Sequence, residues 1–207
     1  MGPELILGID PGTAVTGYGV VAKGGGSALS LLECGVVRTS AGEPLAIRIR
    51  EIFNEVGELI QRFNPHVLVV EDVFQGKNVK SALTLGHARG AILLAGALNE
   101  MTIVEYTPRE IKKAVVGNGN ATKDQVAFMV QQQLKLKTAP SPSDAADGVA
   151  AALCTIQHHF RNRVFVLCWE HGENIEGTWR KHEGNIWRTS SMHACMHACM
   201  HACMHAC

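Results

Sequence analysis

The sequence predicts an α/β domain with a mixed five-stranded sheet and helices on both faces. Three apolar segments come first, and a glycine-rich turn at residues 24–27 joins the second to the third as in a hairpin. Helical segments then alternate with two further apolar runs, which is typical of strands connected by helices. The length of 207 residues fits one domain of ordinary size plus an appendage.

The expected strands are apolar runs bounded by turn residues. They cover residues 4–10, 17–22, 29–38, 67–71 and 102–106. Helices are expected where apolar residues recur at helical spacing, over residues 44–63, 80–99, 122–136 and 142–158. Thr107 and Glu110 form a capping box around Pro108, which predicts a further helix start.

Composition and charge limit the classes of partner. Hydrophobic residues make up 46% of the chain, and the formal net charge is zero. Residues 75–137 depart from this balance, because nine lysines and arginines against four acidic residues leave an excess of five positive charges. That excess suits a phosphate backbone, although solvated helix surfaces also carry lysines.

Cellular location follows from what the sequence lacks. We see neither an apolar stretch long enough to span a bilayer nor a basic segment ahead of an apolar one at the N-terminus. We therefore expect a soluble cytoplasmic protein with no membrane partner. Cys34 and Cys154 lie in apolar patterns and are expected to be buried, reduced thiols.

Four acidic residues stand where a site would form. Asp10 and Glu71 each close an apolar strand, and the carboxyl ends of strands are where open α/β sheets bind ligands. Asp144 and Asp147 are three residues apart after a helix start, so they share one helical face. Four carboxylates that converge would repel one another, and a pair of Mg²⁺ or Mn²⁺ ions is the natural counter-charge. The predicted chemistry is two-metal hydrolysis of a phosphodiester.

Other readings of these carboxylates exist. An Asp before a glycine is often only a turn residue, and Asp144 would also be favourable simply as a negative charge at a helix N-terminus. The segment at residues 10–13 also resembles the phosphate loop of sugar kinases and actin-like ATPases. Those proteins need two such domains, and this chain is too short for them. Asp72 points away from Glu71 if the strand continues, so we interpret it as structural or solvated.

Several ordered motifs resemble those of RuvC, the bacterial Holliday-junction resolvase family. They are residues 8–13 (Gly-Ile-Asp-Pro-Gly-Thr), 16–19, 70–74 (Val-Glu-Asp-Val-Phe), 77–78, 81–83, 88–90, 106–109, 112, 115–119 and 142–147 (Pro-Ser-Asp-Ala-Ala-Asp). The resemblance covers roughly residues 3–158. It implies a ribonuclease H-like fold for a nuclease domain over residues 1–160.

The resemblance also implies a function. It describes a homodimeric, Mg²⁺-dependent endonuclease that resolves four-way DNA junctions by paired symmetric nicks in recombination and repair. Two metal ions per active site would be held by Asp10, Glu71, Asp144 and Asp147, and Mn²⁺ would substitute for Mg²⁺. The branch-migration proteins RuvA and RuvB are the implied partners, in the bacterial cytoplasm.

Residues for DNA contact come partly from the same resemblance. Lys112 and Lys123 match basic residues implicated in binding or catalysis near the scissile phosphate, and Phe74 matches an aromatic that contacts bases at the junction centre. The expected DNA-binding residues are Phe74, Lys77, Lys80, Arg89, Lys112 and Lys123, with Lys123 also catalytic. One departure is Gly148, where the family more often has Ala, and it should weaken the helix by about 1 kcal/mol.

The C-terminal part, residues 161–207, is predicted to be an atypical, disordered tail. It ends in four copies of Met-His-Ala-Cys. Repeated reading of the tetranucleotide ATGC yields this peptide, so we interpret the repeat as a translated DNA microsatellite. A metal-binding tract is the alternative, since His and Cys are zinc ligands.

Two further functions stay open at this level. One is another ribonuclease H-like nuclease that prefers duplex or hybrid substrates. The other is a non-catalytic junction-binding protein, against which the four retained carboxylates argue.

Overall fold

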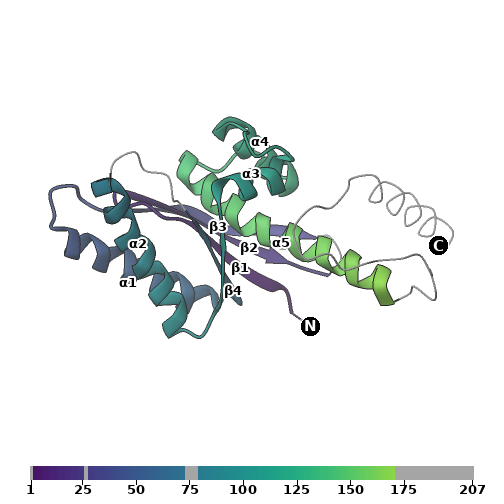
Figure 1. Ribbon diagram of the computed structural model, residues 1–207, viewed down its shortest axis with the longest axis horizontal. Helices are drawn as coiled ribbons and strands as arrows, with labels where there is room; N and C mark the ends of the chain where they lie inside the picture. Colours follow the sequence, from purple (N-terminus) through teal and green to yellow (C-terminus); the bar gives the residue numbers. More distant parts are fainter. Residues whose placement is uncertain (1, 26–27, 73–78, 171–207) are drawn as a thin grey trace, which may run out of the picture. The chain divides into compact units, whose positions relative to one another are not determined.

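The computed structural model describes residues 2–25, 28–72 and 79–170, with side chains to residue 158. Within this part of the chain a single sheet contains five strands in the order β3-β2-β1-β4-β5 (Figure 1). The strands are β1 Glu4–Asp10, β2 Val15–Lys23, β3 Leu29–Arg38, β4 Val67–Glu71 and β5 Thr102–Tyr106. The mixed five-stranded sheet predicted from the sequence is confirmed.

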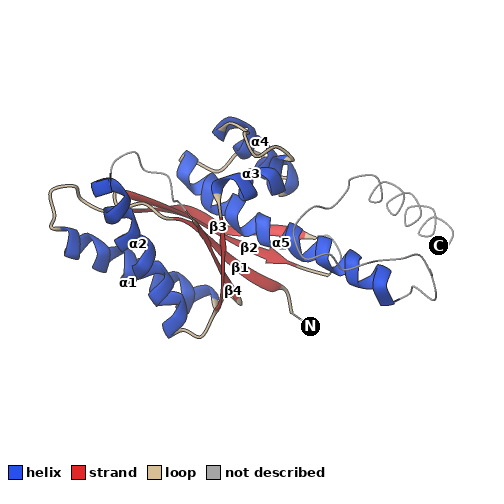
Figure 2. Ribbon diagram, in the orientation of Figure 1, coloured by secondary structure: helices blue, strands red, loops and turns tan. Residues whose placement is uncertain are grey.

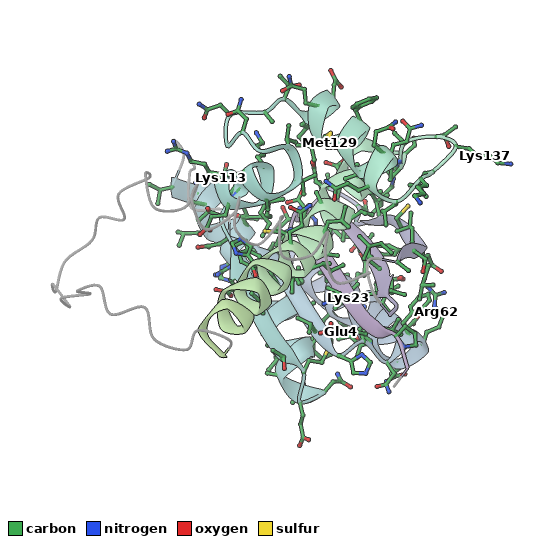
Figure 3. All side chains as sticks on the ribbon, turned by 90° about the vertical axis from the view of Figure 1, so that its right-hand side faces the viewer. Glu4, Lys23, Arg62, Lys113, Met129 and Lys137 are labelled. Atoms are coloured by element: carbon green, nitrogen blue, oxygen red, sulfur yellow. The ribbon has the colours of Figure 1, made fainter. Side chains whose placement is uncertain are left out.

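Pairing in the sheet changes direction at β1. This strand is antiparallel to β2, with Glu4 opposite Lys23, and their side chains form an ion pair at 3.5 Å (Figure 3). On its other side β1 runs parallel to β4, and the last registered pair is Ile9 with Val70. Asp10 and Glu71 each follow that pair by one residue. They therefore emerge side by side on the same face at the carboxyl edge of the sheet.

The helices form one layer on each face of the sheet (Figure 2). Helices α1 Leu45–Phe63 and α2 Val79–Leu98 cover the face that carries Leu7, Ile9 and Val70. The opposite face is covered by α3 Pro108–Val116, α4 Lys123–Gln133 and α5 Ser143–Glu170. Central strands buried on both faces explain why their sequences are continuously apolar rather than alternating.

Capping residues set where α3 and α4 begin. The Thr107 hydroxyl accepts a hydrogen bond from the Glu110 backbone N–H, and the Glu110 carboxylate accepts one from the Thr107 N–H, so the predicted capping box is present. Thr122 and Gln125 form an equivalent box at α4. Both boxes fix helices whose first residues lie near the acidic edge of the sheet, so they matter for the site.

Helix α5 is longer than predicted. It continues to Glu170, and the compact unit of the chain runs from Met1 to Glu170, so the predicted boundary after residue 160 falls inside the helix. Residues 159–170 contain no Gly or Pro, so nothing in their backbone ends the helix. The Met-His-Ala-Cys repeat lies outside the described residues.

Helix α2 has an unusual composition. Over the described residues it is long and apolar enough to cross a membrane, contrary to the sequence-based expectation, although only 28% of its most apolar window is buried. Length and composition alone also fit a helix of a soluble protein. Arg89 in its middle forms ion pairs with Asp72 and Glu105, which ties the helix to the sheet.

Candidate metal centre

Three carboxylates from two elements converge at the carboxyl edge of the sheet. Asp10 ends β1, and Asp144 and Asp147 lie in the first turns of α5. One oxygen from each of the three can be chosen so that all lie within 4.8 Å of one another. Residues 134 positions apart in the chain are thus brought to one point by the packing of α5 across β1 and β2.

Glycines allow α5 to approach the sheet this closely. A Cβ added to Gly17 of β2 would overlap the carbonyl oxygen of Asp144. A Cβ added to Gly148 of α5 would lie 2.5 to 2.7 Å from the Tyr18 backbone. Backbone therefore packs against backbone at the helix turn that carries Asp144 and Asp147. Gly148, which the sequence alone marks only as a weakening of the helix, has a packing role here.

Glu71 lies beside this group, on the strand next to Asp10. It is outside the set of oxygens within 4.8 Å, but its charge interacts with those of Asp10 and Asp147. Burial, followed by repulsion from Asp10 and Asp147, raises the pKa of Glu71 to about 8. Burial and then the Asp147 charge raise the pKa of Asp10 to about 7. Both carboxylates therefore lack sufficient positive charge around them near neutral pH.

The donor set decides which cation fits. All four side chains offer oxygen ligands only, which suits hard divalent ions such as Mg²⁺ and Mn²⁺ rather than softer metals. Oxygens within 4.8 Å of one another are close enough for one ion to be bound by all three side chains. A divalent cation would also stabilise the ionised forms of Asp10 and Glu71, whose pKa values are raised by burial and then by neighbouring carboxylates.

Two lysines provide positive charge at this edge. The Lys123 ammonium, at the start of α4, donates a hydrogen bond to Asp147 Oδ2 at 2.7 Å and lies 3.7 Å from Asp144 Oδ1. That hydrogen bond raises the pKa of Lys123. Lys112 on α3 is half-buried, and its charge, like that of Lys123, offsets part of the rise in the pKa of Glu71. Lys123 thus contacts the carboxylates directly, whereas Lys112 interacts with Glu71 through its charge.

The loop that follows Asp10 is held by residues that sequence reasoning missed. The Thr16 hydroxyl donates to the Gly12 carbonyl at 2.6 Å. Arg48 of α1 donates from Nη2 to the Thr13 carbonyl at 2.6 Å and from Nε to the Thr39 hydroxyl at 2.9 Å. These contacts join segments up to 35 residues apart, so no local sequence pattern predicts them.

The other predicted DNA contacts have mixed placements. Lys80 is exposed in the first turn of α2. Arg89 is instead engaged with two carboxylates, Glu105 Oε2 at 2.7 Å and Asp72 Oδ1 at 3.2 Å. Asp72 points away from Glu71, in agreement with its structural interpretation. Phe74 and Lys77 lie outside the described residues.

Comparison with known proteins identifies the family. The sequence profile of the crossover junction endodeoxyribonuclease RuvC matches residues 6–155. The chain belongs to the RuvC family. It is 45% identical over 163 residues to the crossover junction endodeoxyribonuclease RuvC of Pelotomaculum thermopropionicum, an alignment that covers 79% of this chain and 99% of that relative.

Solved RuvC structures have the same architecture. The Thermus thermophilus RuvC structure superposes with a TM-score of 0.70 at 38% identity, over 76% of this chain and 96% of that one. The T. thermophilus RuvC in complex with a Holliday junction substrate gives a TM-score of 0.69 at 35% identity, with the same coverage. The ribonuclease H-like fold expected for the RuvC family is thereby confirmed.

Proposed function

We propose that this RuvC-family chain is an endonuclease that resolves four-way DNA junctions by paired, symmetric nicks in recombination and repair. The observation that carries the proposal is the group of three carboxylates from β1 and α5 within 4.8 Å, with Glu71 beside it. A relative of the same fold forms a complex with a Holliday junction, which supports this substrate class.

Asp10, Glu71, Asp144 and Asp147 would hold two Mg²⁺ ions, with Mn²⁺ able to substitute. Such a pair of ions, when bound, activates an attacking water and offsets the charge that develops on the leaving 3′ oxygen. The products would carry a 5′ phosphate and a 3′ hydroxyl. No side chain needs to form a covalent intermediate, so Asp10 and Glu71 act as ligands and not as nucleophiles.

The lysines have separate tasks around the scissile phosphate. Lys123 has an exposed ammonium at the helix start, already 2.7 Å from Asp147. It is placed to stabilise negative charge that grows on the phosphate in the transition state. Lys112 and Lys80 would mainly attract the DNA backbone, and the excess of positive charge over residues 75–137 supports such a role.

We propose that the active form is a homodimer, because two symmetric nicks need two active sites. Helix α2 supports this with an exposed apolar stripe. Its large members are Val79, Leu83, Leu94 and Leu98, which are 74, 63, 53 and 66% exposed. Gly86 and Gly90 lie between them on the same side, with open space where a Cβ would stand. A second copy of α2 could therefore approach closely at the centre and bury the leucines at the ends.

RuvA and RuvB would deliver the junction, and the bacterial cytoplasm would be the site of action. Both statements extend the family relationship to this chain. The exposed α2 stripe would be covered in the dimer, which is why a helix of such apolar composition suits a soluble protein.

The test compares three substrates. Purified protein is incubated with a four-way junction, a linear duplex of the same sequence and an RNA/DNA hybrid, each with Mg²⁺ or EDTA. The proposal predicts Mg²⁺-dependent cleavage of the junction alone. Cleavage of duplex or hybrid at the same rate would favour another ribonuclease H-like nuclease, and binding without cleavage would favour a junction-binding protein.

A further inference from the structure

Arg89 links three elements beside the metal centre. It lies on α2, next to the buried residues Ala88 and Ala91, and its Nη2 contacts Glu105 on β5 at 2.7 Å. The same nitrogen lies 3.2 Å from Asp72 Oδ1, in the residue that directly follows Glu71. The side chains of the three residues are only 23, 38 and 27% exposed for Arg89, Glu105 and Asp72.

The strand geometry explains this arrangement. Val70 is registered with Glu105 and Glu71 with Tyr106, and the Asp72 N–H donates to the Tyr106 carbonyl at 2.8 Å, which prolongs the ladder. Side chains alternate along a strand, so Asp72 and Glu105 point to the α2 face while Glu71 points to the α5 face. Arg89 therefore contacts the carboxyl end of β4 on the α2 face of the sheet, and the metal centre lies on the opposite face.

Contact with DNA is a poor alternative for Arg89. Its guanidinium already faces two carboxylates, and a phosphate would have to compete with both. Its Nε is buried without a hydrogen-bond partner, and the contact with Asp72 is an ion pair rather than an aligned hydrogen bond. Packing and ion pairs together hold the Arg89 side chain in place. Removing the guanidinium would leave the charges of Asp72 and Glu105 half-buried and without their ion-pair partner.

We infer that Arg89 is a positioning residue: by pairing with Asp72 and Glu105 it fixes the end of β4 and thereby sets where the Glu71 carboxylate stands relative to Asp10. This inference rests on the proposed function, since it assigns Glu71 to the metal centre. It also connects the metal centre to α2, the helix with the exposed apolar stripe.

The direction in which the metal affinity changes shows whether Arg89 acts by positioning Glu71 or only through its positive charge. Loss of a positive charge near an acidic site would, by electrostatics alone, raise its affinity for a cation. Loss of position would lower that affinity, because Glu71 would no longer be held at the other carboxylates. Residues that orient metal ligands typically cost about 10- to 100-fold in metal affinity when changed.

The experiment measures Mn²⁺ binding to the DNA-free protein by calorimetry, beside junction affinity in EDTA. Arg89→Gln should weaken Mn²⁺ binding at least about tenfold and leave junction affinity within about twofold of wild type. Arg89→Lys retains the charge but not the forked geometry of the guanidinium. Its Mn²⁺ affinity should therefore lie between those of wild type and Arg89→Gln. Arg50→Gln, at an exposed position of α1, removes the same charge as a control and should change neither quantity.

A double-mutant cycle adds a second readout. If the pair acts as one unit, Asp72→Asn combined with Arg89→Gln should weaken Mn²⁺ binding no more than Arg89→Gln alone. Should Arg89→Gln fail to fold, Glu105→Gln removes only the 2.7 Å partner and should show a smaller loss of Mn²⁺ affinity.

Three results would overturn the inference. They are unchanged or tighter Mn²⁺ binding in Arg89→Gln, a loss of junction affinity with normal Mn²⁺ binding, and independent effects of Asp72 and Arg89. Because metal binding is read without DNA, failure of the wild type to cut a junction would refute the proposed function and leave this test standing.

Discussion

Asp10→Asn should make the metal-free protein more stable at alkaline pH although it removes a proposed metal ligand. Asp10 is held at the sheet edge among other carboxylates, and burial and the Asp147 charge raise its pKa from 3.8 to about 7. A group whose pKa is higher in the folded state stabilises the fold below its unfolded pKa. That contribution is lost as the pH rises through the folded pKa.

The magnitude follows from the pKa. A rise from 3.8 to about 7 sets a ceiling of about 4 kcal/mol for the destabilisation by ionised Asp10, at ~1.4 kcal/mol for each tenfold change in proton affinity. Part of this cost comes from the interaction of Asp10 with Glu71, whose own pKa is raised to about 8. We therefore expect Asp10→Asn to gain about 2 kcal/mol at pH 8.5 and less than about 1 kcal/mol near pH 5.

Urea unfolding in EDTA at pH 5, 7 and 8.5 measures these differences. Wild type should lose stability across this range, and Asp10→Asn should lose less. Glu58→Gln, at an exposed position of α1, is the matched control and should stay within about 0.5 kcal/mol of wild type at every pH. A wild type whose stability does not fall with pH, or an Asp10→Asn protein that is less stable at pH 8.5, would refute the reasoning.

Three further predictions concern other parts of the chain. Lys123→Ala should slow single-turnover cleavage at saturating enzyme by on the order of 10²-fold. Its junction affinity, measured over a salt series, should stay near that of wild type. An unaltered cleavage rate would show that Lys123 is an ordinary surface lysine. Gly148→Ala should lower the free energy of unfolding in urea by more than about 1 kcal/mol and slow cleavage, because its Cβ would meet the Tyr18 backbone at 2.5 Å. A gain in stability would instead show that the higher helix propensity of Ala outweighs this contact. Deleting residues 171–207 should leave junction cleavage intact, since the family match ends at residue 155 and all four carboxylates precede it; a folded, dimeric but inactive truncation would contradict this.

Much of the fold was predictable because its signals are local. Asp10 and Glu71 could be placed because each ends a continuous apolar run, and strand ends meet at one edge of a sheet. Asp144 and Asp147 could be paired because residues three apart share a helical face. The capping box at Thr107 was likewise visible in four consecutive residues.

The remaining features depend on contacts between distant segments. Arg89 and its partner Glu105 are 16 residues apart on different elements, so the sequence, which predicts Arg89 as a DNA contact, gives no sign of this pairing. Arg48 and Thr13 are 35 residues apart. Gly148 lowers helix propensity, and only the packed structure reveals that it faces the Tyr18 backbone. Helix α5 runs past its predicted end because residues 159–170 contain no Gly or Pro to end it.

The most direct test of the account is the cleavage rate of a four-way junction by Asp10→Asn in Mg²⁺, measured at saturating enzyme beside junction affinity in EDTA. The account predicts that this variant is folded, binds the junction at least as tightly as wild type, and cuts it at least about 10³-fold more slowly, because an amide replaces a charged metal ligand. Cleavage at the wild-type rate would contradict the assignment of the carboxylates at β1, β4 and α5 as the catalytic metal centre.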